Sequence, residues 1–148
     1  MTRLSLTLVA IFAVTAFAAE KKLALKDLSP ALQKAVQEQA KGGEIKSIST
    51  EKENGVTQYE VDTMLNGKHR SFDLSTAGAL LELEEETTLD SIPPAAKAAI
   101  EKKVAGGKID LVETVTRGSN TFYEANYTAK GGKKHEVMVK PDGTPTKD

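Results

Sequence analysis

An internal duplication limits the possible folds of this chain more than any other feature. When the sequence from Leu28 onward is aligned with the sequence from Ile92 onward, the offset is 64 and residues 28–67 share 11 identities in 40 positions. Chance would give about two or three identities over such a span. One inserted residue near Gly132 then shifts the offset to 65. The duplication predicts two similar structural units in series.

Each copy begins with the pattern of a helix. In the first copy, Ser29 supplies an N-cap hydroxyl and Pro30 fits the first helical position. Apolar residues then recur at helical spacing, namely Leu28, Leu32, Ala35, Val36 and Ala40 in the first copy and Ile92, Ala96, Ala99, Ile100 and Val104 in the second. The Gly-Gly pairs at 42–43 and 106–107 are expected to end these helices, because glycine adopts the left-handed conformation at little steric cost.

After each Gly-Gly pair the apolar period changes to two, which is typical of strands. The expected strands are 45–50, 57–65, 70–74 and 80–84 in the first copy and 109–116, 121–128 and 135–139 in the second. Turn sequences such as Asn66-Gly67 and Gly131-Gly132 separate them. The predicted fold class is α+β, with two tandem units that each pack one helix on a three- to four-stranded antiparallel meander sheet.

The N-terminus has the layout of a secretory signal peptide. Arg3 precedes an apolar stretch at residues 4–17, and Ala16 and Ala18 place small residues before a cleavage point between Ala18 and Ala19. The alternative is an N-terminal membrane anchor, but the apolar stretch is short for a span. We therefore predict a signal peptide at 1–18, unit 1 at 22–86 and unit 2 at 87–148. The mature protein would be periplasmic or secreted, without a stable membrane anchor.

Composition and motifs exclude several classes of function. The chain has no Cys, which excludes disulfides, thiolate zinc sites and cysteine nucleophiles. A formal net charge of −1 without a basic block argues against a nucleic-acid partner. No nucleophile elbow, phosphate-binding loop or His-Glu-x-x-His motif occurs. We predict no catalytic residue, no cofactor and no metal site, and we interpret His69 and His135 as solvent-exposed residues of strands or turns.

The ordered set of motifs resembles the PepSY-like, β-lactamase-inhibitor-like family. The residues that carry the resemblance are Ile-Pro-Pro-Ala-Ala-Lys at 92–97, Tyr123-Glu124 and Lys-Pro-Asp-Gly at 140–143, with counterparts at 28–31, 59–61 and 77–82 in the first copy. The resemblance covers nearly all of the predicted mature chain. It implies small secreted or periplasmic domains, often in tandem, that lack known catalytic residues.

Two acidic features have structural interpretations. Tyr59-Glu60 and Tyr123-Glu124 are expected to place Tyr inward and Glu outward on a strand, or alternatively to put Tyr hydroxyls at the edge of a binding surface. The acidic run at 82–86 is expected to be a solvated strand end and linker.

A possible partner-binding edge lies near the C-terminus. After Gly143 the second copy has Pro145 and no apolar residue, so its last strand is expected to have an incompletely paired edge. An extended peptide could add to this edge, which comprises His135, Glu136, Val137, Met138, Val139 and Lys140. The alternative is that Lys133, Lys134 and Lys140 only protect the edge against aggregation.

These observations favour an exported, non-enzymatic module that binds a protein or peptide and inhibits or modulates an envelope or secreted protein. The partner is not identified, and the chain is expected to be a monomer or to associate weakly with itself. The alternative is a periplasmic domain that senses a small ligand or a metal.

Overall fold

The computed structural model describes residues 21–53 and 55–146. Two helices of 11 residues each, one short 3-10 helix and nine strands make up this part of the chain. In chain order the elements are β1 (Lys21–Lys22), η1 (Leu25–Asp27), α1 (Pro30–Ala40), β2 (Glu44–Glu53), β3 (Val56–Leu65), β4 (Lys68–Ser75), β5 (Leu80–Glu86), α2 (Pro94–Val104), β6 (Lys108–Arg117), β7 (Asn120–Thr128), β8 (Lys134–Val139) and β9 (Pro145–Thr146). The predicted signal peptide lies outside the described residues.

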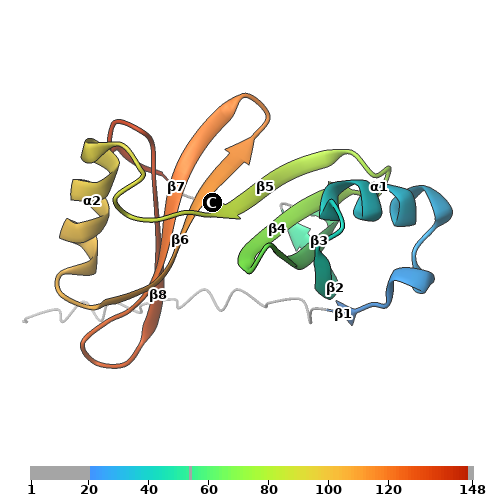
Figure 1. Ribbon diagram of the computed structural model, residues 1–148, viewed down its shortest axis with the longest axis horizontal. Helices are drawn as coiled ribbons and strands as arrows, with labels where there is room; N and C mark the ends of the chain where they lie inside the picture. Colours follow the sequence, from blue (N-terminus) through green and yellow to red (C-terminus); the bar gives the residue numbers. More distant parts are fainter. Residues whose placement is uncertain (1–20, 54, 147–148) are drawn as a thin grey trace, which may run out of the picture.

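All nine strands form one continuous antiparallel sheet in the order of the sequence (Figure 1). The predicted fold class, with a separate sheet for each unit, is therefore wrong. The two halves join because β5 pairs with β6 from Leu83, opposite Thr116, to Glu86, opposite Glu113. This pairing satisfies backbone groups that two separate sheets would leave exposed at their edges. The unit limits at residues 22–86 and 87–148 stay a prediction.

Both helices begin and end where the sequence predicts. The Ser29 side chain accepts a hydrogen bond from the Leu32 backbone N–H at the start of α1. At the other end of α1, the left-handed conformation begins at Lys41, with φ 52°, and continues through Gly42, with φ 82°. The left-handed turn thus begins at Lys41, one residue before the glycine. Gly42 extends the turn at little steric cost because glycine has no Cβ.

Two hydrophobic clusters lie on the helix side of the sheet. Beneath α1, Val36, Val61, Phe72 and Leu74 are almost fully buried. Beneath α2, the cluster comprises Ile92, Ala96, Ile100, Val104, Val112, Ala125, Tyr127 and Val139. Phe72 on β4 pairs with Leu83 on β5, and Leu83 pairs with Thr116 on β6. Directly paired residues point to the same face of a sheet. The helix-facing side of the first half therefore continues into the second half, and both helices cover one side of the sheet.

A register shift near the start of β2 and of β6 sets which residues face the helices. In β2 the shift lies between Ile45 and Ser47, and in β6 it lies between Ile109 and Leu111. Residues three apart normally point to opposite faces of a strand. Because the bulge inserts one residue, Ile45 and Ile48 both reach the core. The polar residues of these strands then lie on the opposite side, which we call the open face.

Candidate functional site

The open face contains a hollow with a volume of about 600 Å³. Residues from β2 to β8 line it, so the hollow extends across both halves of the sheet. Its cationic lining residues are Lys52 and Arg117, and His69 also lies there. Its carboxylate residues are Glu51, Glu60, Asp62, Asp73, Glu82, Glu84, Glu113, Glu124 and Glu136. The hollow is therefore strongly acidic.

Several of these carboxylates lie directly opposite one another on neighbouring strands. Asp73 on β4 pairs with Glu60 on β3 and with Glu82 on β5. Like charges in directly opposed positions destabilise a sheet by up to about 1 kcal/mol per pair. The fold alone gives no reason for this arrangement.

A second acidic row crosses the junction between the two halves. Glu113 on β6 lies opposite Glu86 on β5 and opposite Glu124 on β7. Glu113 and Glu124 are only 2% and 6% exposed. Burying a carboxylate is costly unless it is paired or hydrogen-bonded. The contacts of Glu113 and Glu124 therefore decide how much stability their burial costs the folded protein.

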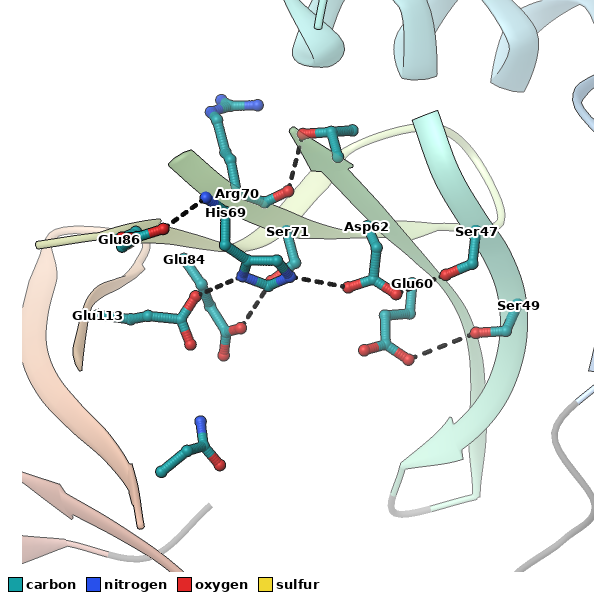
Figure 2. A network of polar contacts seen from close by, with 12 residues as sticks. Ser47, Ser49, Glu60, Asp62, His69, Arg70, Ser71, Glu84, Glu86 and Glu113 are labelled. Carbon is teal, nitrogen blue, oxygen red and sulfur yellow. Dashed lines mark hydrogen bonds and ion pairs between the residues drawn. The ribbon is translucent and has the colours of Figure 1, made fainter. Parts of the chain in front are cut away.

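His69 connects the two halves of the acidic face (Figure 2). Its Nδ1 lies 2.7 Å from Oε1 of Glu113, and its Nε2 lies 3.4 Å from Oδ1 of Asp62. Its backbone N–H also donates to Oε2 of Glu86 at 2.7 Å. One imidazole on β4 thus contacts carboxylates from β3 and β6, and its backbone contacts β5.

The pKa of His69 reflects two opposing effects. Burial lowers this pKa, but the hydrogen bond and negative charge of Glu113, together with Asp62, outweigh burial and raise the pKa above 6.5. The protonated imidazolium can donate from both ring nitrogens. His69 in its charged form therefore compensates part of the acidic charge.

The Glu84 carboxyl group on the open face has a strongly perturbed pKa. It accepts a hydrogen bond from the Ser71 hydroxyl at 2.6 Å. Burial is the main cause that raises its pKa, and the nearby charges of Glu113 and Glu82 add to it. The Ser71 hydrogen bond acts in the opposite direction, and the pKa is raised to about 8. Glu84 is therefore largely protonated at neutral pH.

The remaining contacts of the open face are mostly between neighbouring strands. Arg117 on β6 donates to both carboxylate oxygens of Glu82 on β5. The Gln58 amide donates to Glu51 at 2.6 Å and to Asp73 at 3.0 Å. These bonds hold the acidic side chains in fixed positions, which favours binding because less conformational entropy is lost.

Three sequence interpretations of these residues are wrong. His69 does lie on a strand, β4, but it is not solvent-exposed, because it is half-buried between Asp62 and Glu113. The acidic run at 82–86 is not a linker, because it belongs to β5, in the interior of the sheet. Glu124 does not point into open solvent, because the open face buries it. Alternation within β3 and β5 could have identified one polar face, but only the β5–β6 pairing brings Glu113 to His69.

The structure places the predicted binding edge at β8. His135 is exposed and stacks on the Tyr127 ring, with 5.5 Å between ring centroids. β9 covers part of the edge, because Met138 pairs with Thr146 and Val139 pairs with Pro145. Glu136, Val137 and Lys140 belong to the same predicted edge, and peptide addition there stays a prediction. The predicted cleavage residues Ala18 and Ala19 lie outside the described residues.

Within residues 21–53 and 55–146, no cluster of three or more His, Asp or Glu side chains has the arrangement of a metal site. In the same part of the chain, neither helix combines the length and the apolar character that crossing a membrane requires.

Comparisons with known proteins identify the fold. No protein-family model matches the chain, and a search of curated proteins gives no significant match. Among solved structures, a proposed periplasmic protein from Bacteroides eggerthii is similar, with a TM-score of 0.63 and 15% identity over 81% of this chain and 86% of that chain. A DUF2874 family protein from Bacteroides uniformis gives a TM-score of 0.61 and 15% identity over 80% and 86% of the two chains.

A third solved structure is a BLIP-like protein from Bacteroides fragilis. It gives a TM-score of 0.54 and 20% identity over 81% of this chain and 84% of that chain. At this identity the similarity concerns the fold, whereas the PepSY resemblance and the tandem pair stay predictions. The chain has a BLIP-like fold.

Proposed function

We propose that this protein is an exported, non-enzymatic binding protein that holds a basic segment of another protein or peptide on its open face. The observation that carries the proposal is the acidic hollow of about 600 Å³, whose lining comes from both halves of the sheet. Its similarity in fold to a BLIP-like protein and to a proposed periplasmic protein supports a binding role outside the cytoplasm.

The chemistry of the hollow favours a cationic ligand. Pairs such as Asp73 with Glu60 and Asp73 with Glu82 place like charges opposite one another. A lysine or arginine side chain between them would relieve this repulsion and would form charge-assisted hydrogen bonds. Local arrangements that cost stability are expected mainly at functional sites.

The shape of the hollow favours a polypeptide segment over a single small ion. The lining residues run from Glu51 on β2 to Glu136 on β8, and Leu111 adds apolar surface among the carboxylates. An extended or looped segment with two or more basic residues would contact both halves. By binding such a segment, the protein would inhibit or modulate an envelope or secreted partner.

A peptide-binding measurement tests this function. Fluorescence anisotropy would follow a labelled oligolysine peptide, with an oligoglutamate peptide of equal length as the control. We expect binding of oligolysine only, with an affinity that falls as salt increases. The substitutions Glu60→Gln and Glu136→Gln should each weaken binding roughly two- to fivefold, whereas Glu38→Gln on α1 and Glu44→Gln at the start of β2 should have little effect.

Affinity capture from an envelope fraction would then identify the partner. Hydrogen exchange of the captured complex should show new protection in β3 to β7. Equal binding of the two peptides, or protection confined to α1 and α2, would contradict the proposed function. A melting temperature that rises with calcium or magnesium alone would favour cation sensing instead.

A further inference from the structure

We propose that a second surface, at the C-terminal end of α2, binds anionic lipid surfaces through a cluster of lysine side chains. This surface adjoins the acidic hollow at Glu136, which lines the hollow and also a second cavity together with Lys103. The inference goes beyond the proposed function. We call it the lysine end. It consists of Lys102, Lys103, Lys108, Lys130, Lys133 and Lys134, all of them exposed.

The end of α2 and the loop between β7 and β8 bring four of these lysines together. Lys102 and Lys103 lie in the last turn of α2. The loop between β7 and β8 approaches that turn, because a Cβ built on Gly106 would lie 3.2 Å from Cε of Lys130. Figure 1 shows the C-terminal end of α2 and this loop at the same end of the molecule. The end of α2 and the loop between β7 and β8 therefore form one basic surface.

The strands extend the same surface onto the sheet. Lys108 at the start of β6 lies opposite Thr128 on β7, and Thr128 lies opposite Lys134 on β8. Asp110 is the acidic residue in this row, and it bonds to Lys108 at 2.8 Å and to Thr128 at 2.6 Å. Glu101 in the last turn of α2 and Glu136 on β8 also lie close to these lysines. The lysines still outnumber the carboxylates of the lysine end.

Most of these ammonium groups are available to an external anion. Within residues 21–53 and 55–146, the side chains of Lys102, Lys103, Lys130 and Lys133 take part in none of the ion pairs of the structure. Several like charges held close together raise the free energy of the isolated protein. An anionic partner would lower it.

The fold itself does not require most of these lysines, as the first half of the chain shows, although Lys133 corresponds to Lys68 at the offset of 65. Glu38, Gln39, Glu44 and Asn66 occupy the positions that correspond to Lys102, Lys103, Lys108 and Lys130 at the offset of 64. A lysine near a helix C-terminus does interact favourably with the helix dipole. However, α1 ends without any basic residue in its last turn. The helix dipole therefore does not by itself account for the lysines at the end of α2.

The chemistry of the lysine end favours a lipid surface over a nucleic acid. All six cations are lysines, which act as mobile, hydrated point charges, and none is an arginine with its bidentate geometry. Base recognition in nucleic acids relies on arginine forks and stacked aromatic rings. An anionic membrane surface instead attracts clustered lysines by about 1 kcal/mol per residue, which is about fivefold in affinity.

Vesicle cosedimentation tests the proposal on residues 19–148, so that the apolar N-terminus cannot insert into the vesicles. The vesicles would contain equimolar phosphatidylglycerol and phosphatidylcholine, with pure phosphatidylcholine as the neutral control. We expect binding only to the anionic vesicles. Binding should be strong at about 0.05 M salt and lost at about 1 M, where the screening length is about 3 Å.

A pair of matched double variants makes the test specific to the lysine end. Lys130→Gln with Lys133→Gln should reduce partitioning about thirtyfold. The control, Lys41→Gln with Lys68→Gln, removes the same charge at the corresponding end of the first half and should reduce partitioning less than about threefold. Unfolding curves and oligolysine binding should be unchanged in both, which separates this proposal from the function of the acidic face.

Three results would overturn the proposal. The first is equal binding to neutral and anionic vesicles, and the second is an equal loss of binding in the two double variants. The third is tighter binding to a DNA duplex than to vesicles at the same phosphate concentration, which would assign the lysine end to a nucleic acid.

Discussion

His69 and Glu113 are 44 residues apart in sequence, yet His69 Nδ1 and Glu113 Oε1 are separated by only 2.7 Å. The contact links β4 in the first half of the sheet to β6 in the second. The Glu113 side chain is 3% exposed and the His69 side chain is 31% exposed. The carboxylate is thus the deeply buried partner, and it depends on the imidazole for compensation of its charge.

Removing the imidazole should destabilise the protein. His69→Ala leaves Glu113 buried beside Glu86 and Glu124, and we expect the free energy of unfolding to fall by about 1–3 kcal/mol at pH 6. Chemical denaturation measures this change. His135→Ala is the control because His135 is exposed, and it should cost less than about 1 kcal/mol.

A double-mutant cycle would show whether the effect arises from the pair. In Glu113→Gln protein, which carries no buried charge at that position, His69→Ala should cost much less. An equal cost of His69→Ala in both backgrounds would mean that the imidazole contributes only packing.

Stability should decrease as pH rises from about 5 to about 8. The pKa of Glu84 is near 4.5 when unfolded and about 8 when folded, so between these values the folded state retains a proton that the unfolded state has released. The raised pKa of His69 acts in the same direction, because its contribution is complete below 6.5 and is lost as pH passes the folded pKa. We expect a loss of at least about 1 kcal/mol, measured by denaturation at several pH values.

The pH effect can be assigned with one further variant. Glu84→Gln, which cannot ionise, should flatten the profile between pH 5 and 8, and the remaining slope should belong to His69. The lowered pKa values of Asp90, Asp110 and Asp142 affect stability only below their ordinary value of 3.8. A stability that rises across the window from pH 5 to 8 would contradict the prediction.

Arg70 should tolerate an apolar side chain of similar length better than truncation. It is 2% exposed, it donates to the Gln39 carbonyl near the end of α1 and to Glu85 at 3.2 Å, and it lies 5.5 Å from the Phe72 ring centroid. Its Nη2 has no hydrogen-bond partner within residues 21–53 and 55–146. Arg70→Met keeps the packing and removes the unsatisfied donor, so its cost should be about 1 kcal/mol or less.

Arg70→Ala is the informative comparison for this prediction. It removes the aliphatic stem as well and leaves a cavity under α1, which should cost about 2–4 kcal/mol. Denaturation curves of the two variants give the difference. An equal cost for the two variants would show that the guanidinium hydrogen bonds, and not the stem, stabilise the end of α1.

The two halves should stabilise each other through the β5–β6 pairing. A fragment of residues 22–86 would leave the outer edge of β5 without its β6 partner and would bury little surface for its size. We expect the fragment to melt well below residues 19–148, and the longer chain to unfold in a single transition by calorimetry. Equal melting temperatures would show that the halves are independent.

Local sequence signals predicted the elements of this protein well. The Ser29 cap, the 3.6-residue apolar period of α1 and the glycines after it depend on residues only a few positions apart. The same holds for hairpins such as the one at Asn66-Gly67, where turn chemistry fixes the connection. Such contacts are encoded in neighbouring residues, so a pattern within about ten residues is enough to predict them.

The candidate site could not be predicted in the same way, because it depends on which strands pair. Duplication indicated two similar copies, but no local pattern shows that β5 of one pairs with β6 of the other. That pairing brings Glu113 to His69 and makes Glu84 part of the acidic face. Sequence alone thus determined the helices, the strands and their alternation, whereas the tertiary structure decided the single sheet and the charges that meet on it. The physical reason is that every strand edge offers the same kind of backbone donors and acceptors, so only the folded chain selects one partner among several edges.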